Sequence, residues 1–217
     1  MTVTARRRHP RPMSPGRPRR LTSMTASVDL HPAAERLAGL VENLPPEALD
    51  RPTPCERYSV AALLDHLHGS VLAFRAAAGK SPLPGGPSGD AAHLVADWQT
   101  RIPADARALA DDWSDPAAWE GMTAAGGVDL PGEVAGIVGL DELVIHGWDL
   151  AKATGQPAGY DGPGLEEVLG LVTEFRGGGI EGLFGPAVRI PDNASVFDRI
   201  LGVSGRDPGW QPPAGAR

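Results

Sequence analysis

The stretch from Val138 to Ala151 reads VGLDELVIHGWDLA and decides the fold of this 217-residue chain. At about 100° per residue its apolar side chains cover most of a helix surface, which predicts a helix largely surrounded by protein. Glu142, His146 and Asp149 share the remaining narrow sector. Glu142 and His146 are four residues apart, so they stack on one helical face where a single metal ion can bind both. The alternative interpretation is that this sector is the solvent-facing side of an amphipathic helix.

The helical pattern extends from about Gly132 to Thr154, where Gly155 is typical of a helix end and a following proline forbids continuation. Upstream, the stretch SVAALLDHLHGSVLAF predicts a second helix from about Val60 to Ala78. Ser59 is its expected N-cap and Gly79 its expected C-cap. Both stretches therefore carry their own start or stop signals.

The second helix offers a third candidate ligand. His66 lies beside the leucine stripe and over a sector of small residues, where a neighbouring helix or a ligand can approach closely. Two imidazoles and one carboxylate leave one open position on a tetrahedral metal, which is the arrangement of catalytic sites. A histidine at the edge of a stripe is also a common structural residue. His68 and Asp65 are the substitutes if His66 faces elsewhere.

The remaining pattern predicts further helices separated by loops rich in Pro and Gly. Between Trp113 and Pro131 the helical period is lost, which indicates a short strand or hairpin across one end of the bundle. Four long helices with short C-terminal helical additions predict an all-α, up-down four-helix bundle, a fold that places metal ligands on inward faces. The other expected helices span about Pro32 to Leu44, Asp90 to Asp112 with a distortion at Pro103, 165–176, and a segment near 193–206 with Asn193 as N-cap.

Composition limits the classes of protein and site. With 41% hydrophobic and 22% charged residues and no apolar run near about 18 residues, we expect a cytoplasmic protein without a membrane span. The single cysteine, Cys55, excludes an internal disulfide framework and is expected to be a small buried residue. Any metal site must then use imidazole and carboxylate.

The first 23 residues differ in kind from the rest of the chain. They hold seven arginines and no acid, so the formal charge of -7 leaves -14 for the remainder. Residues 1–27 are therefore predicted to be a disordered Arg/Pro-rich tail, 28–210 the helical bundle and 211–217 a flexible C-terminus. The acidic remainder argues against a nucleic-acid partner.

Three segments together resemble a known superfamily. TPCERYSVAALLDHLHGS at 53–70, DELVIHGWDLAKATGQP at 141–157 and DRILGVSGRDPGW at 198–210 are similar to the DinB-like metal-binding helical bundles. The resemblance is to the actinobacterial branch related to the mycothiol-dependent maleylpyruvate isomerase N-terminal domain. It covers about Val28 to Trp210. That isomerase carries a separate C-terminal domain, which the roughly 50 residues between Gln156 and Trp210 are too few to form.

The resemblance implies a site and a class of chemistry. Its metal ligands are His66, Glu142 and His146, with zinc as the first expectation and nickel or iron as alternatives. Mycothiol is the expected co-substrate, a small electrophile the expected substrate, and a homodimer is plausible. The leading hypothesis is thus a thiol-dependent transferase or isomerase. The alternative is a non-catalytic metal-binding or stress-associated bundle. Loops 80–90 and 113–131 are the expected specificity loops.

Overall fold

The computed structural model describes residues 27–178, 185–191, 193–213 and 215, so the predicted disordered tail lies almost wholly outside the described residues. The regular secondary structure of the described part is helical apart from one two-stranded hairpin and an isolated bridge between Pro52 and Ser59, which confirms the all-α prediction. Within it, no helix combines the length and hydropathy that a membrane crossing requires. The α-helices are α1 (His31–Glu42), α2 (Val60–Ala78), α3 (Trp98–Trp113), α4 (Pro116–Trp119), α5 (Gly132–Thr154), α6 (Leu165–Gly178) and α7 (Val196–Val203); the strands are β1 (Met122–Ala125) and β2 (Val128–Pro131), and two 3-10 turns lie at Pro46–Ala48 and Ala91–His93.

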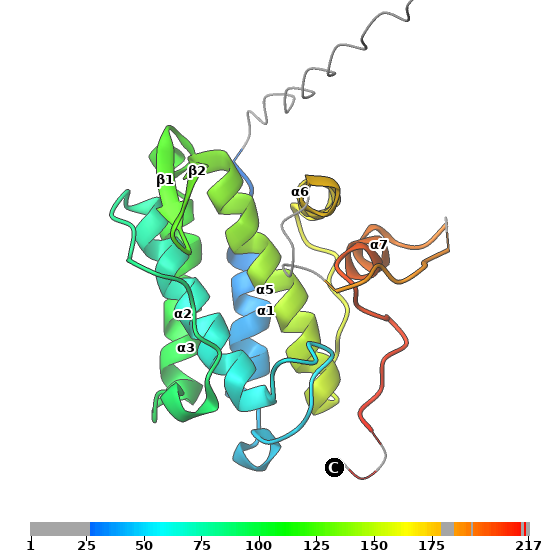
Figure 1. Cartoon of the computed structure of the whole chain (residues 1–217). Coiled ribbons are helices and arrows are strands. Elements are labelled where there is room, and N and C mark those ends of the chain that lie inside the picture. Colours follow the sequence, from blue (N-terminus) through cyan, green and yellow to red (C-terminus); the bar gives the residue numbers. More distant parts are fainter. Residues whose placement is uncertain (1–26, 179–184, 192, 214, 216–217) are drawn as a thin grey trace, which may run out of the picture.

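Helices α1, α2, α3 and α5 run side by side around one core (Figure 1). Helix α1 packs against α3 and α5, and α2 packs against the same two helices, so α1 and α2 lie across the bundle from each other. Leucine, isoleucine, valine and alanine fill the space between them. The ring places α2 directly beside α5, and these are the two helices that carry the candidate ligands.

Helices α2 and α5 have the bounds that their sequences predict. The Ser59 hydroxyl accepts a hydrogen bond from the Ala62 N–H, which satisfies one of the free donors at the start of α2. Helix α5 ends at Gly155, whose φ of 73° is left-handed and which therefore suits glycine. Local signals thus account for the start of α2 and the end of α5.

The predicted hairpin is confirmed and lies at one end of the bundle (Figure 1). Strands β1 and β2 pair antiparallel and pack on α2 and α5. The neighbouring loop is tied to α2 through Asp65, whose carboxylate accepts hydrogen bonds from the Ser88 hydroxyl and from the N–H groups of Gly89 and Asp90. Pro87 of this loop packs so closely on Gly69 that a side chain at 69 would have to displace it.

Two sequence predictions were wrong at element ends. Asp90 caps only the short turn at Ala91–His93, and α3 begins at Trp98 and runs without a break through Pro103. Asn193 is not the N-cap of α7, because Ser195 accepts the hydrogen bond from the Asp198 N–H instead. Asn193 precedes α7 by three positions, within the range where capping choices compete, whereas Asp90 precedes α3 by eight positions and caps a separate turn.

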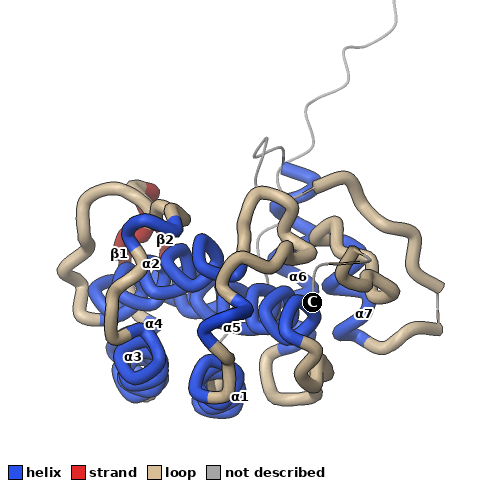
Figure 2. The backbone as a smooth tube through the Cα atoms, turned by 90° about the horizontal axis from the view of Figure 1, so that it is seen from below, coloured by secondary structure: helices blue, strands red, loops and turns tan. Residues whose placement is uncertain are grey.

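The C-terminal helices form a second layer on one side of the bundle (Figure 2). Helix α6 packs against α5 and against α7. Phe197, Ile200 and Leu201 of α7 are buried, and the chain after α7 turns back toward α5. This turn brings residues near 206 to the helix that carries Glu142 and His146.

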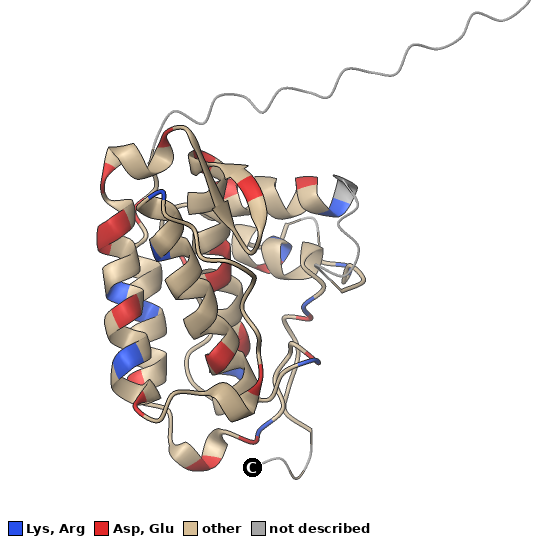
Figure 3. Cartoon of the chain, turned by 60° about the vertical axis from the view of Figure 1, so that its left-hand side comes forward, with Lys and Arg blue, Asp and Glu red and all other residues tan. Residues whose placement is uncertain are grey.

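Acidic and basic residues are intermixed on the surface of the helical bundle (Figure 3). Arg107 of α3, for example, pairs with Glu35 and Glu42 of α1. Exposed pairs of this kind add little stability, on the order of 0–1 kcal/mol each. The bundle is therefore held mainly by its apolar core, and the polar residues of interest are the buried ones.

Candidate metal centre

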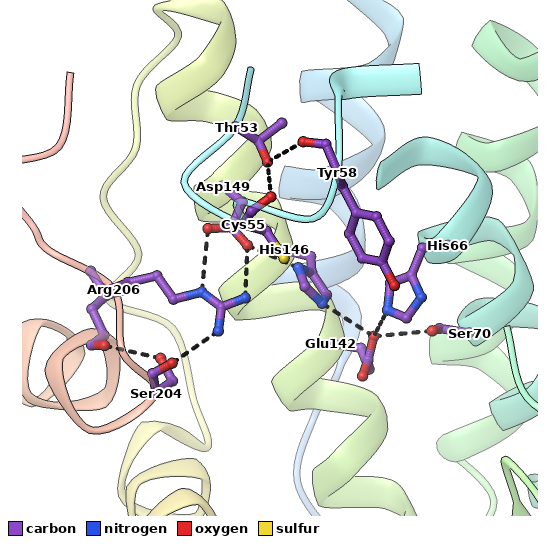
Figure 4. A network of polar contacts seen from close by, with 11 residues as sticks. Thr53, Cys55, Tyr58, His66, Ser70, Glu142, His146, Asp149, Ser204 and Arg206 are labelled. Carbon is purple, nitrogen blue, oxygen red and sulfur yellow. Dashed lines mark hydrogen bonds and ion pairs between the residues drawn. The ribbon is translucent and has the colours of Figure 1, made fainter. Parts of the chain in front are cut away.

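Three predicted ligands converge between α2 and α5 (Figure 4). His66 Nε2 lies 3.2 Å from Glu142 Oε2, and His146 Nε2 lies 3.8 Å from the same oxygen. The two imidazole rings meet edge to face with centroids 5.0 Å apart. One donor atom from each of the three residues lies within 4.8 Å of the other two. The i, i+4 spacing on α5 and the packing of α2 against α5 together produce this convergence.

Glu142 is held as an anion at the centre of the group. Burial by itself would raise the pKa of Glu142, but the hydrogen bond from His66, the charges of both histidines and the Ser70 hydroxyl lower it to about 2. Ser70, one turn after His66 on α2, donates its hydroxyl to Glu142 Oε2 at 3.0 Å. A half-buried carboxylate that stays ionised is suited to bind a cation.

His146 is oriented by a partner on its other nitrogen. Nδ1 of His146 lies 2.9 Å from Oδ2 of Asp149, which is fully buried on the next turn of α5. Arg206, from the segment after α7, donates to both oxygens of Asp149 at 3.4 and 3.1 Å (Figure 4). In a neutral His146 that donates its Nδ1–H to Asp149, Nε2 is unprotonated and free to bind a metal.

The Asp149–Arg206 pair is a buried ion pair. Burial opposes the charge of Asp149, yet Arg206 and His146 outweigh it and lower the pKa of this carboxyl below its ordinary value. Burial likewise opposes the charge of Arg206, and Asp149 raises its pKa above the ordinary value. Because each charge depends on the other, the segment after α7 and the face of α5 that carries His146 and Asp149 are coupled energetically.

His66 is oriented by stacking. The ring of Tyr58 stacks on it with centroids 5.1 Å apart. Its Nδ1 atom is buried and has no hydrogen-bond partner among the described residues. His66 therefore differs from His146, whose second nitrogen is occupied by Asp149.

The two substitutes for His66 are committed elsewhere. His68 points toward α3, where its Nε2 lies 3.0 Å from Asp105. Asp65 holds the loop described above. Of the three α2 candidates, His66 is thus the one that the structure brings to Glu142 and His146.

A cavity of about 760 Å³ adjoins this group. The loop around Cys55, the hairpin, α2, α5 and the segment after α7 all contribute to its walls. Both expected specificity loops reach it, the first through Pro87 and the second through Ala125, Gly126, Val128 and Leu130. Its lining includes His66, Ser70, Phe74, Val138, Asp141, Glu142, Ile145, His146, Phe175 and Arg206.

Cys55 lies closer to the site than its sequence context indicated. It is half-buried and lines the cavity, and its sulfur lies within 4.8 Å of donor atoms of His146 and Asp149. Burial raises the pKa of Cys55 above its ordinary value, which disfavours the thiolate. The Asp149 oxygens are already used by His146 and Arg206, so the group of His66, Glu142 and His146 is the better cation site.

Sequence reasoning did not single out several residues of the site. Arg206 is more than 50 positions from its partner Asp149, and Asp141 is part of the predicted helix without a distinguishing pattern. A lone arginine or aspartate in a chain with 20 Lys and Arg and 27 Asp and Glu residues carries no positional signal. The sequence signal that could have pointed to Arg206 is its place in SGRDPG, within the stretch 198–210 that resembles the family.

The fold and the site define a class: a helical bundle with two histidines and one glutamate on facing inner helices. Residues 30–151 match the family model of the mycothiol maleylpyruvate isomerase N-terminal domain. The match covers more than half of the chain and includes α1, α2, α3 and α5. The chain belongs to this family, as the sequence resemblance predicted.

Two relatives support the assignment. An uncharacterized protein of Mycobacterium tuberculosis, found in two strains, is 35% identical over 134 residues, which is 59% of this chain and 67% of the relative. No solved structure matches the chain at a comparable level of significance. The segment after α6, which contains Arg206, lies outside the family match.

Proposed function

We propose that this protein binds a divalent metal through His66, Glu142 and His146 and uses it with a low-molecular-weight thiol, mycothiol, in a transferase or isomerase reaction. The observation that carries the proposal is the convergence of three donor atoms, within 4.8 Å of one another, at the wall of a cavity. Membership of the mycothiol-related family supports the choice of thiol.

The donor set fits a metal such as zinc. Bonds of about 2.0–2.2 Å from zinc to nitrogen and oxygen place two ligand atoms roughly 3.3 Å apart around a tetrahedron. The separations of 3.2 and 3.8 Å from Glu142 to the two histidine nitrogens are close to this value. Imidazole and carboxylate also suit nickel and iron, so zinc is the first choice of three.

The chain's own residues prepare the site for such a reaction. Asp149 fixes His146 with Nε2 toward Glu142, and Ser70 fixes the carboxylate of Glu142. Phe74 and Ile145 offer an apolar wall on which a small electrophile can be held close to the ligands. A bound divalent cation would stabilise a thiolate over a thiol and polarise a carbonyl near neutral pH.

The test combines metal content with turnover. Full-length protein is loaded with zinc and incubated with mycothiol and a model electrophile such as 1-chloro-2,4-dinitrobenzene or maleylpyruvate, and products are followed by chromatography. We expect metal-dependent product formation that is lost in His146→Ala. His68→Ala is the matched control, because it removes an imidazole from the same region of α2 without touching the candidate ligands.

Two results would contradict the proposal. Unchanged turnover in His146→Ala would remove the metal from the mechanism. Bound zinc without any thiol-dependent product would instead support the alternative, a non-catalytic metal-binding bundle.

A further inference from the structure

Asp141 is a buried acid of the cavity that the metal-binding group does not use. It precedes Glu142 on α5, is only 8% exposed and lines the cavity. Its Oδ1 atom is buried and has no hydrogen-bond partner among the described residues. A buried carboxyl oxygen without a partner costs free energy, whereas a leucine of similar size at this position would not.

The two other carboxylates of α5 near the cavity are engaged, and Glu56, which also lines the cavity, is exposed to solvent. Glu142 accepts hydrogen bonds from His66 and Ser70, and Asp149 is held by His146 and Arg206. Asp141 is therefore the buried acid of the cavity wall with an oxygen that has no hydrogen-bond partner among the described residues. An unpartnered buried polar group of this kind calls for an explanation by water or a ligand.

The surroundings of Asp141 restrict the ligand. The same cavity has the apolar side chains of Phe74, Val138 and Ile145 in its wall. A carboxyl group keeps an acceptor oxygen whether or not it is protonated. The complementary ligand group is therefore a hydrogen-bond donor, a hydroxyl or an N–H, on a molecule that also has apolar surface.

We propose that Asp141 is a specificity-determining residue, which accepts a hydrogen bond from a hydroxyl or N–H group of the small molecule in the cavity. The proposal rests on the proposed function in one respect, because it takes this cavity as the substrate site. It requires neither a bound metal nor a thiol, and its test uses neither.

The experiment uses pairs of probes that differ by one hydroxyl group. Benzyl alcohol is compared with ethylbenzene, and phenol with toluene, by ligand-observed NMR titration of the full-length protein. In at least one pair we expect the hydroxyl-bearing probe to bind wild type about fivefold more tightly than its partner, the size of one net hydrogen bond. Asp141→Asn keeps an acceptor oxygen and should retain the preference. Asp141→Leu should lose it, while its affinity for the apolar probe stays equal or increases.

Folding of the variants gives a second readout. Asp141→Leu removes an unpartnered buried carboxyl, so its thermal unfolding should be cooperative with a Tm above that of wild type. Asp141→Ala provides the same comparison of probes if the leucine variant does not fold. A wild type without hydroxyl preference in either pair, or a preference that persists in Asp141→Leu and Asp141→Ala, would overturn the proposal.

The outcome is separable from that of the proposed function. Loss of thiol-dependent turnover with an intact hydroxyl preference would leave Asp141 as a recognition residue of a binding protein. The reverse result would leave the metal chemistry in place and assign recognition to other residues.

Discussion

Two histidines of α2, only two residues apart, belong to clusters of different kinds. His68 faces α3 and pairs with Asp105, which Arg75 also binds at 2.8 Å. His66 faces α5 and meets Glu142 beside a second histidine and a cavity. The His68 cluster contains its own cation, because Arg75 binds both Asp105 and Asp112. In the His66 cluster, donor atoms of His66, Glu142 and His146 lie close to one another. The nearby arginine, Arg206, pairs with Asp149 and not with Glu142.

The comparison shows that a histidine–carboxylate contact does not by itself indicate a metal site. Both histidines are mostly buried and both have an acid within about 3 Å. What distinguishes the His66 cluster is the number of converging donors and the adjoining cavity. Variants that act on one cluster and spare the other therefore test the distinction.

The largest effect is expected from removing a ligand. His146→Ala should lower the affinity for zinc by more than about 100-fold, beyond the 10–100-fold typical of losing an orienting partner. His68→Ala should leave zinc affinity unchanged and lower only the stability of the fold. Zinc affinity is measured by competition with a chromophoric chelator and zinc content by mass spectrometry of the native protein. Equal losses in the two variants would remove the distinction between the clusters.

A smaller effect is expected from the arginine of each cluster. Arg206→Met leaves the fully buried Asp149 charge without its main partner and should lower the free energy of unfolding by about 3–5 kcal/mol. It should also weaken zinc binding about 10–100-fold, since His146 loses its fixed orientation. Arg75→Met is the matched control, and because Arg75 is 32% exposed its loss should cost about 1 kcal/mol or less.

Chemical denaturation and the zinc competition assay measure both variants. An unfolding free energy for Arg206→Met no lower than that for Arg75→Met would mean that the segment after α7 does not stabilise the site.

The smallest effect concerns a third, exposed histidine cluster. His31, at the start of α1, contacts Asp29 and Asp111, and hydrogen bonds to Asp111 and Asp29 raise its pKa above 6.5. A pKa raised by folding stabilises the protein below the unfolded value and ceases to do so as pH rises through the folded value. His31→Gln should therefore lower stability at pH 5 and have little effect at pH 9. Urea unfolding midpoints of the wild type and His31→Gln between pH 5 and pH 9 measure this loss of stability. An equal loss at pH 5 and pH 9 would contradict a raised pKa for His31.

The bounds of α2 and α5 could be predicted because their signals are local. Ser59 and Gly155 lie next to the residues they cap, and the apolar period of each helix is continuous between the ends. The start of α3 could not be predicted in the same way. Asp90 is a good N-cap by residue type, yet the chain forms only a short turn there and begins the helix at Trp98, whose indole is buried in the core.

The group of candidate metal ligands was partly predictable for a related reason. Glu142 and His146 lie on one helix, so the helical period alone brings them together. For His66 the sequence left His68 and Asp65 as alternatives, and only the packing of α2 against α5 on one side and α3 on the other separates them.

By itself the sequence determined the all-α class, the bounds of α2 and α5, and the pairing of Glu142 with His146. These features depend on contacts between residues that are close in the chain. The tertiary structure decided which face of α2 meets α5, that Arg206 reaches Asp149 from outside the family-matched region, and that Asp141 is buried beside a cavity. These features join residues far apart in the chain. Their energies come from burial and paired charge, which exist only once the helices have packed.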